Sequence, residues 1–157
     1  MNTMQTLQWH EGPFAALSTS NLYAILAARV DVFVVEQDCP YPELDGLDQR
    51  SHHVWAQDAA GAITAYARIT EPGTRFEEPS IGRVLTALSY RNQGLGRELM
   101  NRALDVAQTM YPGQALRISA QQHLDRFYAS LGFEFVRGPY PEDGIPHVEM
   151  LRSASGR

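Results

Sequence analysis

Residues 81–100 read IGRVLTALSYRNQGLGRELM, and this stretch decides the fold. Its first part belongs to a run rich in apolar residues, 80–87, that is typical of a β-strand. Its last part opens a helix predicted over residues 94–110, which Pro112-Gly113 ends. The apolar residues of this helix recur every three or four positions, as in an amphipathic helix packed on a sheet. They are Leu95, Leu99, Ala103, Val106, Ala107 and Met110.

The turn between this strand and this helix, RNQGLG (residues 91–96), has the features of an anion-binding loop. Gly94 and Gly96 let the backbone approach a ligand closely, and the helix start presents unpaired N–H groups and the positive end of its dipole. Arg91 and Arg97 add positive charge. The turn therefore predicts a pyrophosphate-binding site; the alternative is a tight connection with solvated arginines.

Two common nucleotide-binding motifs do not fit this turn. A Walker A loop needs Gly, four residues and then Gly-Lys-Ser/Thr, and the sequence has no such run. A dinucleotide fingerprint needs a third glycine or an alanine where this chain has Leu99. That fingerprint also belongs in an opening βαβ unit, whereas this turn lies past the middle of the chain. Both motifs are excluded.

The N-terminal part of the chain predicts a helix followed by a long polar loop. Residues 18–21 offer N-caps to a helix whose apolar face would contain Leu22, Ile25, Leu26, Val30 and Phe33. Arg29 falls on the same face, which requires a buried carboxylate or a ligand to meet it. Residues 32–35 either finish the helix or unwind into an extended segment. The loop that follows, residues 36–53, is longer than the about 12–15 residues usual in compact domains, and such loops are usually functional or disordered.

Further strands and one further helix complete the prediction of an α/β domain with a mixed sheet, in which antiparallel hairpins lie at both ends and crossovers in the middle. Glu11-Gly12-Pro13 is expected to end the first strand, and a Pro/Gly-rich turn to join the last two. The whole chain, 1–157, is expected to form one domain with 153–157 as a loose tail. The other strands are predicted at residues 7–9, 53–57, 62–69, 116–120, 133–136 and 147–151, and the helix at 121–131.

Composition narrows the class of protein. The chain has 157 residues, of which 44% are hydrophobic and 20% charged, as in folded globular proteins. A net charge of −5 argues against broad electrostatic contact with nucleic acid. The longest apolar run, residues 22–28, is far shorter than the ~20 residues that a membrane-spanning helix needs, and the N-terminus lacks the pattern of a secretory signal. One cysteine, Cys39, allows neither an internal disulfide nor a Cys-based zinc site. We expect a cytoplasmic protein without a nucleic-acid or membrane partner.

The glycine turn also resembles the acetyl-CoA-binding motif of the GNAT acetyltransferases. Their signature, Arg/Gln-x-x-Gly-x-Gly/Ala, corresponds to Arg91, Gly94 and Gly96. The segment FYASLGF (residues 127–133) resembles the second motif of that superfamily, an aromatic-Tyr pair followed by a Gly-Phe step. The two motifs stand in the order that the superfamily shows.

Two more segments resemble the ElaA-like branch of the superfamily, namely VFVVEQDCPYPELDGLD (residues 32–48) and EDGIPH (residues 142–147). The resemblance covers roughly residues 7–151. It implies the GNAT acyl-CoA N-acyltransferase fold, a central mixed sheet flanked by helices. It also implies an N-acetyltransferase that uses acetyl-CoA as the acetyl donor and needs no metal.

The resemblance places the donor site by position. In GNAT folds the strand before the glycine turn splays from its neighbour, and its free backbone groups hold the pantetheine arm. This implies backbone contacts at Val84 and Thr86, and the Thr86 amide is our candidate to stabilise the oxyanion. The chain departs from the common pattern at Gln121, where many members have Asn, and at Leu124, where many have Ala. The expected cofactor-binding residues are Val84, Leu85, Thr86, Arg91, Asn92, Gln93, Gly94, Leu95, Gly96 and Arg97.

Attack of an amine on a thioester needs both reactants held together, a neutral amine and a way to release the thiolate. Tyr128 lies where the superfamily has a tyrosine near the thioester sulfur, and a phenol can protonate a thiolate. From helix spacing alone, the same side chain would be a core aromatic. The strand 81–87 has no Asp or Glu to serve as general base. Glu36, His123 and a water-mediated route all stay open as the base.

The acceptor is expected to be the primary amine of a small molecule or a peptide. Asp45 and Asp48 of the long loop, together with Glu36, either attract such a cationic amine or are simply solvated. Two alternatives to the acetyltransferase stay open: a catalytically silent acyl-CoA sensor, and an acyltransferase with a longer acyl-CoA donor. A homodimer stays open as well, because edge strands in such folds often pair.

Overall fold

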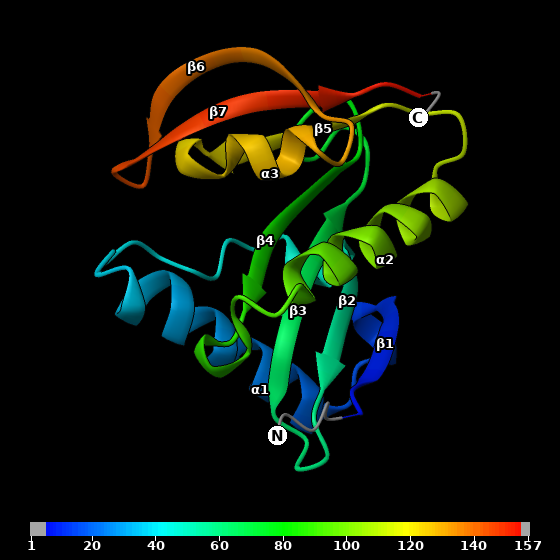
Figure 1. The fold of residues 1–157 in the computed structure, drawn as a ribbon. Helices are drawn as coiled ribbons and strands as arrows, with labels where there is room; N and C mark the ends of the chain where they lie inside the picture. The colour runs from blue at the N-terminus through cyan, green and yellow to red at the C-terminus, as the bar shows by residue number, and fades with distance from the viewer. Residues whose placement is uncertain (1–5, 155–157) are drawn as a thin grey trace.

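The structure, a computed structural model, describes residues 6–154 (Figure 1). Its helices are α1 (Thr19–Arg29), continued by a π-helical segment over Val30–Glu36, α2 (Leu95–Met110) and α3 (Asp125–Ala129). Single 3-10 turns lie at Phe14–Ala16, Asp48–Arg50, Leu88–Tyr90 and Gln122–Leu124. The strands are β1 (Gln8–Pro13), β2 (His52–Gln57), β3 (Ile63–Thr70), β4 (Ser80–Thr86), β5 (Leu116–Gln121), β6 (Glu134–Glu142) and β7 (Ile145–Arg152).

The first four strands form one sheet in the order β1-β2-β3-β4, and each neighbouring pair is antiparallel. The helices α1 and α2 cover opposite faces of this sheet (Figure 1). Successive side chains of a strand point to opposite faces. On β2, Val54 accordingly packs in the apolar cluster with α2, and Trp55 packs in the cluster with α1. All eight residues of β3 are buried, because both faces of the sheet are covered.

The last three strands form a second antiparallel sheet in the order β5-β7-β6, and α3 packs against it (Figure 1). Ile118 of β5 and Met150 of β7 belong to the same buried cluster as Leu99 of α2 and Ile69 of β3. One apolar core therefore connects the two sheets.

The strands β4 and β5 start side by side and then separate. At their start, the Arg117 N–H donates to the Pro79 carbonyl at 3.2 Å. Beyond this point β4 pairs with β3 and β5 pairs with β7, so a cleft opens between the two sheets. The sheet thus opens beside the strand that precedes the glycine turn, where the resemblance predicts it to open.

Two strands that border Pro/Gly-rich segments are longer than predicted. The strand β1 continues through Gly12 to Pro13, and β6 continues through Gly138 and Pro139 to Glu142. Both strands are edges of their sheets, where a proline costs no hydrogen bond between strands. The turn between β6 and β7 lies after residue 142 instead.

The structure agrees with one of the two expectations for the first predicted helix and shortens the last predicted helix. Ser18 caps α1 by accepting a hydrogen bond from the Asn21 N–H at 3.0 Å, and the chain stays helical through Glu36 instead of unwinding. The predicted helix 121–131 is shorter, because Gln121 still pairs with His147 in the sheet. A 3-10 turn follows, and α3 begins only at Asp125.

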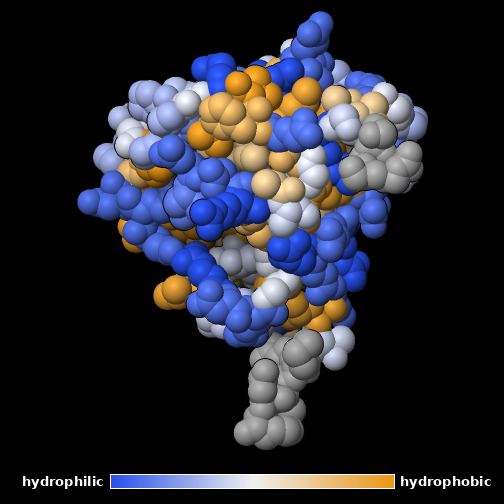
Figure 2. All heavy atoms as spheres, turned by 45° about the horizontal axis from the view of Figure 1, so that its top comes forward, coloured by the Kyte–Doolittle hydropathy of each residue, from blue (hydrophilic) through white to orange (hydrophobic). Residues whose placement is uncertain are grey.

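The surface has an apolar area on the side that carries β6 and β7 (Figure 2). On β6, an edge strand, Phe135 is 60% and Val136 is 42% exposed. A homodimer through such an edge stays a prediction. Within residues 6–154, no helix combines the length and the apolar character that crossing a membrane requires.

Candidate active site

The cleft between β4 and β5 has an empty volume of about 830 Å³, which includes the part open to solvent. Its walls come from the end of the π-helical segment with the loop after it, from β4 and β5, from α3, and from the β6–β7 hairpin. The lining residues that can offer a polar side chain or unpaired backbone groups to a ligand include Val84, Ser119, Tyr128, Glu142, Asp143 and His147.

The alternation of backbone groups along β4 places the Thr86 amide on the cleft side. The Ala87 N–H donates to the Thr64 carbonyl at 2.9 Å, so the N–H and C=O of Ala87 face β3. In an antiparallel ladder the next residue back turns its groups the other way, and Thr86 therefore presents its N–H and C=O at the open edge. The backbone N–H and C=O of Leu85 face β3, as those of Ala87 do. The Leu85 side chain is buried in the cluster with α1. Of the expected contacts on β4, the Thr86 N–H is available to a ligand, whereas the Thr86 carbonyl accepts from Arg91 and the Leu85 side chain belongs to the core.

A β-bulge lies just before this point. Arg83 and Val84 together stand opposite Ala67 of β3, and Arg83 has a left-handed backbone with φ of 52°. Such a bulge disrupts the ladder locally and leaves a residue unpaired. Val84, which lines the cleft, can thus offer backbone groups to a ligand.

The glycine turn has the geometry that close approach of an anion needs. Gly94 precedes α2 with φ of 80°, a conformation that favours glycine. At Gly96 a Cβ would meet only the Thr86 Cγ2 at 3.9 Å, so a ligand can reach the backbone there. The first N–H groups of α2 have no partner within the helix. The turn therefore fits a pyrophosphate group.

The guanidinium of Arg91 ties this turn to two other elements. Its Nε donates to the Thr86 carbonyl at 3.0 Å, and its two terminal nitrogens bind both carboxylate oxygens of Glu36. The hydrogen bonds and the charge of Arg91 outweigh burial and lower the pKa of Glu36. Arg97 donates to Ser130 Oγ at 3.0 Å and lies over the ring of Phe127, which joins α2 to α3.

Tyr128 lies in the wall of the cleft and is 6% exposed. Its ring packs edge-on against Phe127 and Phe133, with centroid distances of 5.1 and 6.1 Å. Burial disfavours the charged phenolate and raises the pKa of Tyr128 to about 12. The phenol therefore keeps its proton at neutral pH and can donate it to a ligand in the cleft.

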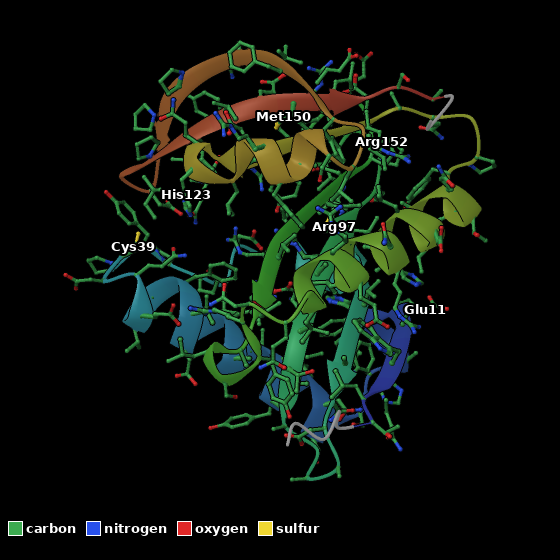
Figure 3. All side chains as sticks on the ribbon, in the orientation of Figure 1. Glu11, Cys39, Arg97, His123, Met150 and Arg152 are labelled. Carbon is green, nitrogen blue, oxygen red and sulfur yellow. The ribbon has the colours of Figure 1, made fainter. Side chains whose placement is uncertain are left out.

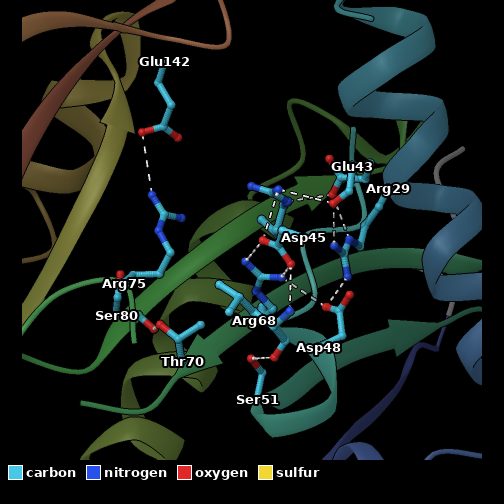
Figure 4. A network of polar contacts seen from close by, with 12 residues as sticks. Arg29, Glu43, Asp45, Asp48, Ser51, Arg68, Thr70, Arg75, Ser80 and Glu142 are labelled. Carbon is cyan, nitrogen blue, oxygen red and sulfur yellow. Dashed lines mark hydrogen bonds and ion pairs between the residues drawn. The ribbon is translucent and has the colours of Figure 1, made fainter. Parts of the chain in front are cut away.

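Acidic residues of the long loop are paired with arginines in a network of ion pairs (Figure 4). Glu43 and Asp48 are buried in it, whereas Asp45 and Glu36 are exposed and each pairs with an arginine. Arg29 is completely buried and binds Glu43 at 2.9 Å and Asp48 at 2.6 Å. This confirms that a carboxylate must meet Arg29. Arg68, also buried, binds Asp48 at 3.1 Å and Asp45 at 2.8 Å. The network fixes the loop on α1 and β3.

His123 lies outside the cleft, whereas Cys39 belongs to its wall (both are labelled in Figure 3). His123 sits in the 3-10 turn ahead of α3, outside the residues that line the cleft. Cys39 lines the cleft, and its thiol donates to the Asp143 carbonyl at 3.0 Å. Among residues 6–154 there is no group of three or more His, Cys, Asp or Glu side chains arranged to hold a metal ion.

Sequence reasoning missed two polar residues of the cleft, Glu142 and His147. Both belong to EDGIPH (residues 142–147), a segment that also carries the resemblance to the family. An acid and a histidine flanking a short Asp-Gly turn are a detectable signal, because a tight hairpin brings its two arms together.

The fold and this site define a GNAT protein, and the chain belongs to that family: the acetyltransferase (GNAT) domain matches residues 25–153. Members of the family are acyl-CoA-dependent acyltransferases. The chain is 39% identical to the protein ElaA of Escherichia coli over 150 residues, which cover 93% of this chain and 96% of ElaA. It is 41% identical to a UPF0039 protein of Synechocystis over 145 residues, 92% of this chain and 94% of that protein.

Solved structures agree with the expected GNAT fold. An acyl-CoA N-acyltransferase from Pseudomonas aeruginosa superposes with a TM-score of 0.90 at 42% identity, covering 94% of this chain and 100% of that one. ElaA of Escherichia coli superposes with a TM-score of 0.89 at 37% identity, with the same coverage. The fold class and the ElaA-like relationship predicted from the sequence are confirmed.

Proposed function

We propose that the protein is an N-acetyltransferase that moves the acetyl group of acetyl-CoA to a primary amine by direct attack, with both substrates bound at once. The cleft between β4 and β5 supports this most strongly, because it combines an open strand edge with a buried phenol. Membership in the family supports acyl-CoA as the class of donor. Acetyl as the transferred group, and the amine of a small molecule or peptide as the acceptor, belong to the proposal.

Backbone groups hold the donor in this proposal. The start of α2 and the turn from Arg91 to Arg97 take the pyrophosphate, which the free N–H groups and the helix dipole favour. The open edge of β4 at Val84 and Thr86 takes the pantetheine arm. The Thr86 N–H then donates to the carbonyl oxygen as negative charge develops on it.

Tyr128 assists departure of the sulfur. A phenol with a pKa of about 12 is a weaker acid than a thiol, whose usual pKa is about 8.5. Tyr128 therefore stabilises the departing thiolate by donating a hydrogen bond. Complete transfer of its proton requires that the phenolate regain one at once, and the acceptor nitrogen, which must lose a proton to become an amide, supplies it.

Thermal unfolding of the purified protein tests the donor site, with acetyl-CoA, CoA, octanoyl-CoA and NAD in parallel. A ligand at 100 times its dissociation constant stabilises by about 2.7 kcal/mol, which is several degrees for a chain of this size. Selective stabilisation by acetyl-CoA supports the proposal. Stronger stabilisation by octanoyl-CoA means that the donor carries a longer acyl chain. If no CoA species raises the unfolding temperature, the proposal is overturned.

A further inference from the structure

His147 of β7 is a buried histidine in the wall of the cleft, 8% exposed. Its Nδ1 lies 2.7 Å from the Ile145 carbonyl oxygen. Because a carbonyl oxygen only accepts, Nδ1 must carry the hydrogen. The neutral ring therefore has its lone pair on Nε2, the nitrogen that is able to take up a proton.

Glu142, across the hairpin, faces that nitrogen. Its Oε2 lies 3.8 Å from His147 Nε2, and its Oε1 accepts the hydroxyl hydrogen of Ser119 at 2.7 Å. Since Ser119 has given its hydrogen to Glu142, its Oγ accepts from the Tyr140 hydroxyl, also at 2.7 Å. This chain of hydrogen bonds fixes a negative charge beside Nε2. A carboxylate at such a distance stabilises an imidazolium once it forms.

The hairpin that holds this pair is itself anchored across the cleft. Asp143 and Gly144 have φ of 51° and 77°, as in the two-residue turns that join tightly twisted strands. The Cys39 thiol donates to the Asp143 carbonyl and so ties the turn to the loop after the π-helical segment. His147 therefore lines the cleft on a braced hairpin, apart from the glycine turn.

The other four histidines do not share these features. His53 is buried and bonded to Tyr66 and to the Asp48 carbonyl, and burial lowers its pKa. His10 stacks on Trp55, and His52 of β2 pairs with Glu11 of β1. His123 lies outside the cleft lining.

We propose that His147 is the general base that removes the proton from the acceptor amine, and that Glu142 is the residue that positions it. The inference rests on the proposed function. A bound ammonium group gives one proton to His147 Nε2 and becomes a neutral amine. Its lone pair forms the C–N bond to the thioester carbon, the C–S bond breaks, and the electron pair leaves on sulfur. The nitrogen's second proton replaces the one that Tyr128 gives to sulfur, and the imidazolium releases its own proton to water.

Several titratable or charged groups lie around His147 on the neighbouring elements. Tyr140 is its partner in the β6–β7 register, with ring centroids 6.5 Å apart, and Arg75 lies 3.7 Å from Glu142. The other such groups in the cleft wall are Cys39, Tyr41, Glu43, Arg83, Tyr128 and Asp143.

The test compares His147→Gln with His52→Gln, a matched control in which the altered histidine also pairs with a glutamate but lies outside the cleft. Rates of thiol release from acetyl-CoA are measured with spermidine, phenethylamine and a lysine-containing tripeptide between pH 5.5 and 9.5. For the amine that the unaltered protein uses fastest, His147→Gln lowers kcat about a hundredfold or more and removes the acid limb of the pH profile. His52→Gln keeps both the kcat and the acid limb of the unaltered protein. Acetyl-CoA binding, measured by calorimetry, is unchanged in His147→Gln.

Two further measurements separate a base from a structural residue. With methoxyamine, which is already unprotonated at neutral pH, the loss in His147→Gln is much smaller, because no ammonium proton has to be removed. Glu142→Gln keeps the hydrogen bond from Ser119 but loses the charge, and it lowers kcat with the protonated amines more than with methoxyamine.

An acid limb that persists in His147→Gln, or an equal loss with methoxyamine, overturns this inference and leaves the acetyltransferase standing. Absence of turnover by the unaltered protein with every amine overturns the proposed function, and the inference falls with it.

Discussion

The hydroxyl of Tyr128 shows how burial sets what a side chain can do. It lies in the cleft wall with its ring held by two phenylalanines, and its pKa is raised to about 12 by burial. Phenylalanine keeps those ring contacts and removes only the donor. Tyr128→Phe should therefore lower kcat about a hundredfold while the dissociation constant of acetyl-CoA stays the same.

Tyr23→Phe is the control for this change, because Tyr23 is 77% exposed on α1. Steady-state rates and calorimetric binding distinguish the two proposed classes of protein. A silent acyl-CoA sensor would have no turnover to lose. Full activity in Tyr128→Phe would remove Tyr128 from the mechanism.

Asp45 gives the protein a dependence of stability on pH. Burial alone would raise its pKa, but the hydrogen bonds and charge of Arg68, with help from the Leu47 N–H and Arg83, lower it to about 2. Since its ordinary pKa is 3.8, the stabilisation is fully present above about pH 4 to 5 and is lost as pH falls toward 2. Asp45→Asn should therefore flatten the fall in the free energy of unfolding between pH 5 and 2, measured by urea denaturation.

The exposed Asp105 on α2 supplies the comparison for this titration. Asp105→Asn should leave the slope as it is. An equally steep fall in Asp45→Asn would mean that Asp45 contributes nothing in this range.

At the scale of residues, the sequence reveals groups that act locally and hides those that meet across the chain. The RNQGLG turn can be recognised in the sequence because its expected ligand contacts come from consecutive residues and one helix start. Arg29 stands out in the sequence because it is a charge on an apolar helix face. Its pairing with Glu43 and Asp48 cannot be predicted from the sequence. The pairing of Glu36 with Arg91, 55 residues apart, depends on tertiary packing, and no local pattern encodes it.

The glycine turn and α2 act as one element, and its two glycines have different tasks. Gly94 has φ of 80°, which costs an alanine about 1 kcal/mol or more. At Gly96 the backbone is helical and a Cβ has room. Gly94→Ala should therefore lower the free energy of unfolding by about 1 kcal/mol, and Gly96→Ala should not lower it, as measured by thermal or urea unfolding. Equal losses in both variants would contradict this division.

At the scale of elements, position in the sheet decided where the predictions from sequence held. The helix α2 and strands β2 to β5 were predicted close to their bounds, because buried faces impose a clear apolar period. The extents of β1 and β6 were missed, because Pro13 and Pro139 look like strand breakers until the strands are known to be edges. The order of strands and the bulge at Arg83 likewise depend on pairing between distant segments.

At the scale of the whole molecule, two kinds of interaction hold the parts together. The apolar core holds the two sheets, and the network of buried ion pairs holds the loop beside the cleft. We infer one domain, because a single buried cluster contains residues of both sheets. The loop beside the cleft is instead held by Arg29 and Arg68, which share Asp48, 8% exposed at its side chain. The sheets and the loop beside the cleft thus rest on different kinds of interaction.

Loss of the shared carboxylate should be costly. Asp48→Asn leaves two buried guanidinium groups short of one negative charge, and breaking a buried pair in this way destabilises by about 3–5 kcal/mol. The exposed Asp31 provides the matched change, Asp31→Asn, which should alter stability by less than about 0.5 kcal/mol. Chemical denaturation of both variants measures this. A loss below about 1 kcal/mol in Asp48→Asn would mean that water replaces the missing charge.

The sharing of one carboxylate by two arginines also has a consequence for descent. A lineage that replaces only Arg29, Asp48 or Arg68 unbalances the charges of the buried network, so a route that begins with one such change passes through a weakened ancestor. Exchange for apolar side chains avoids that penalty only if the other charged members, Glu43, Asp45 and Arg83, change as well. Among diverging relatives, the positions of this network should therefore be inherited together or exchanged together.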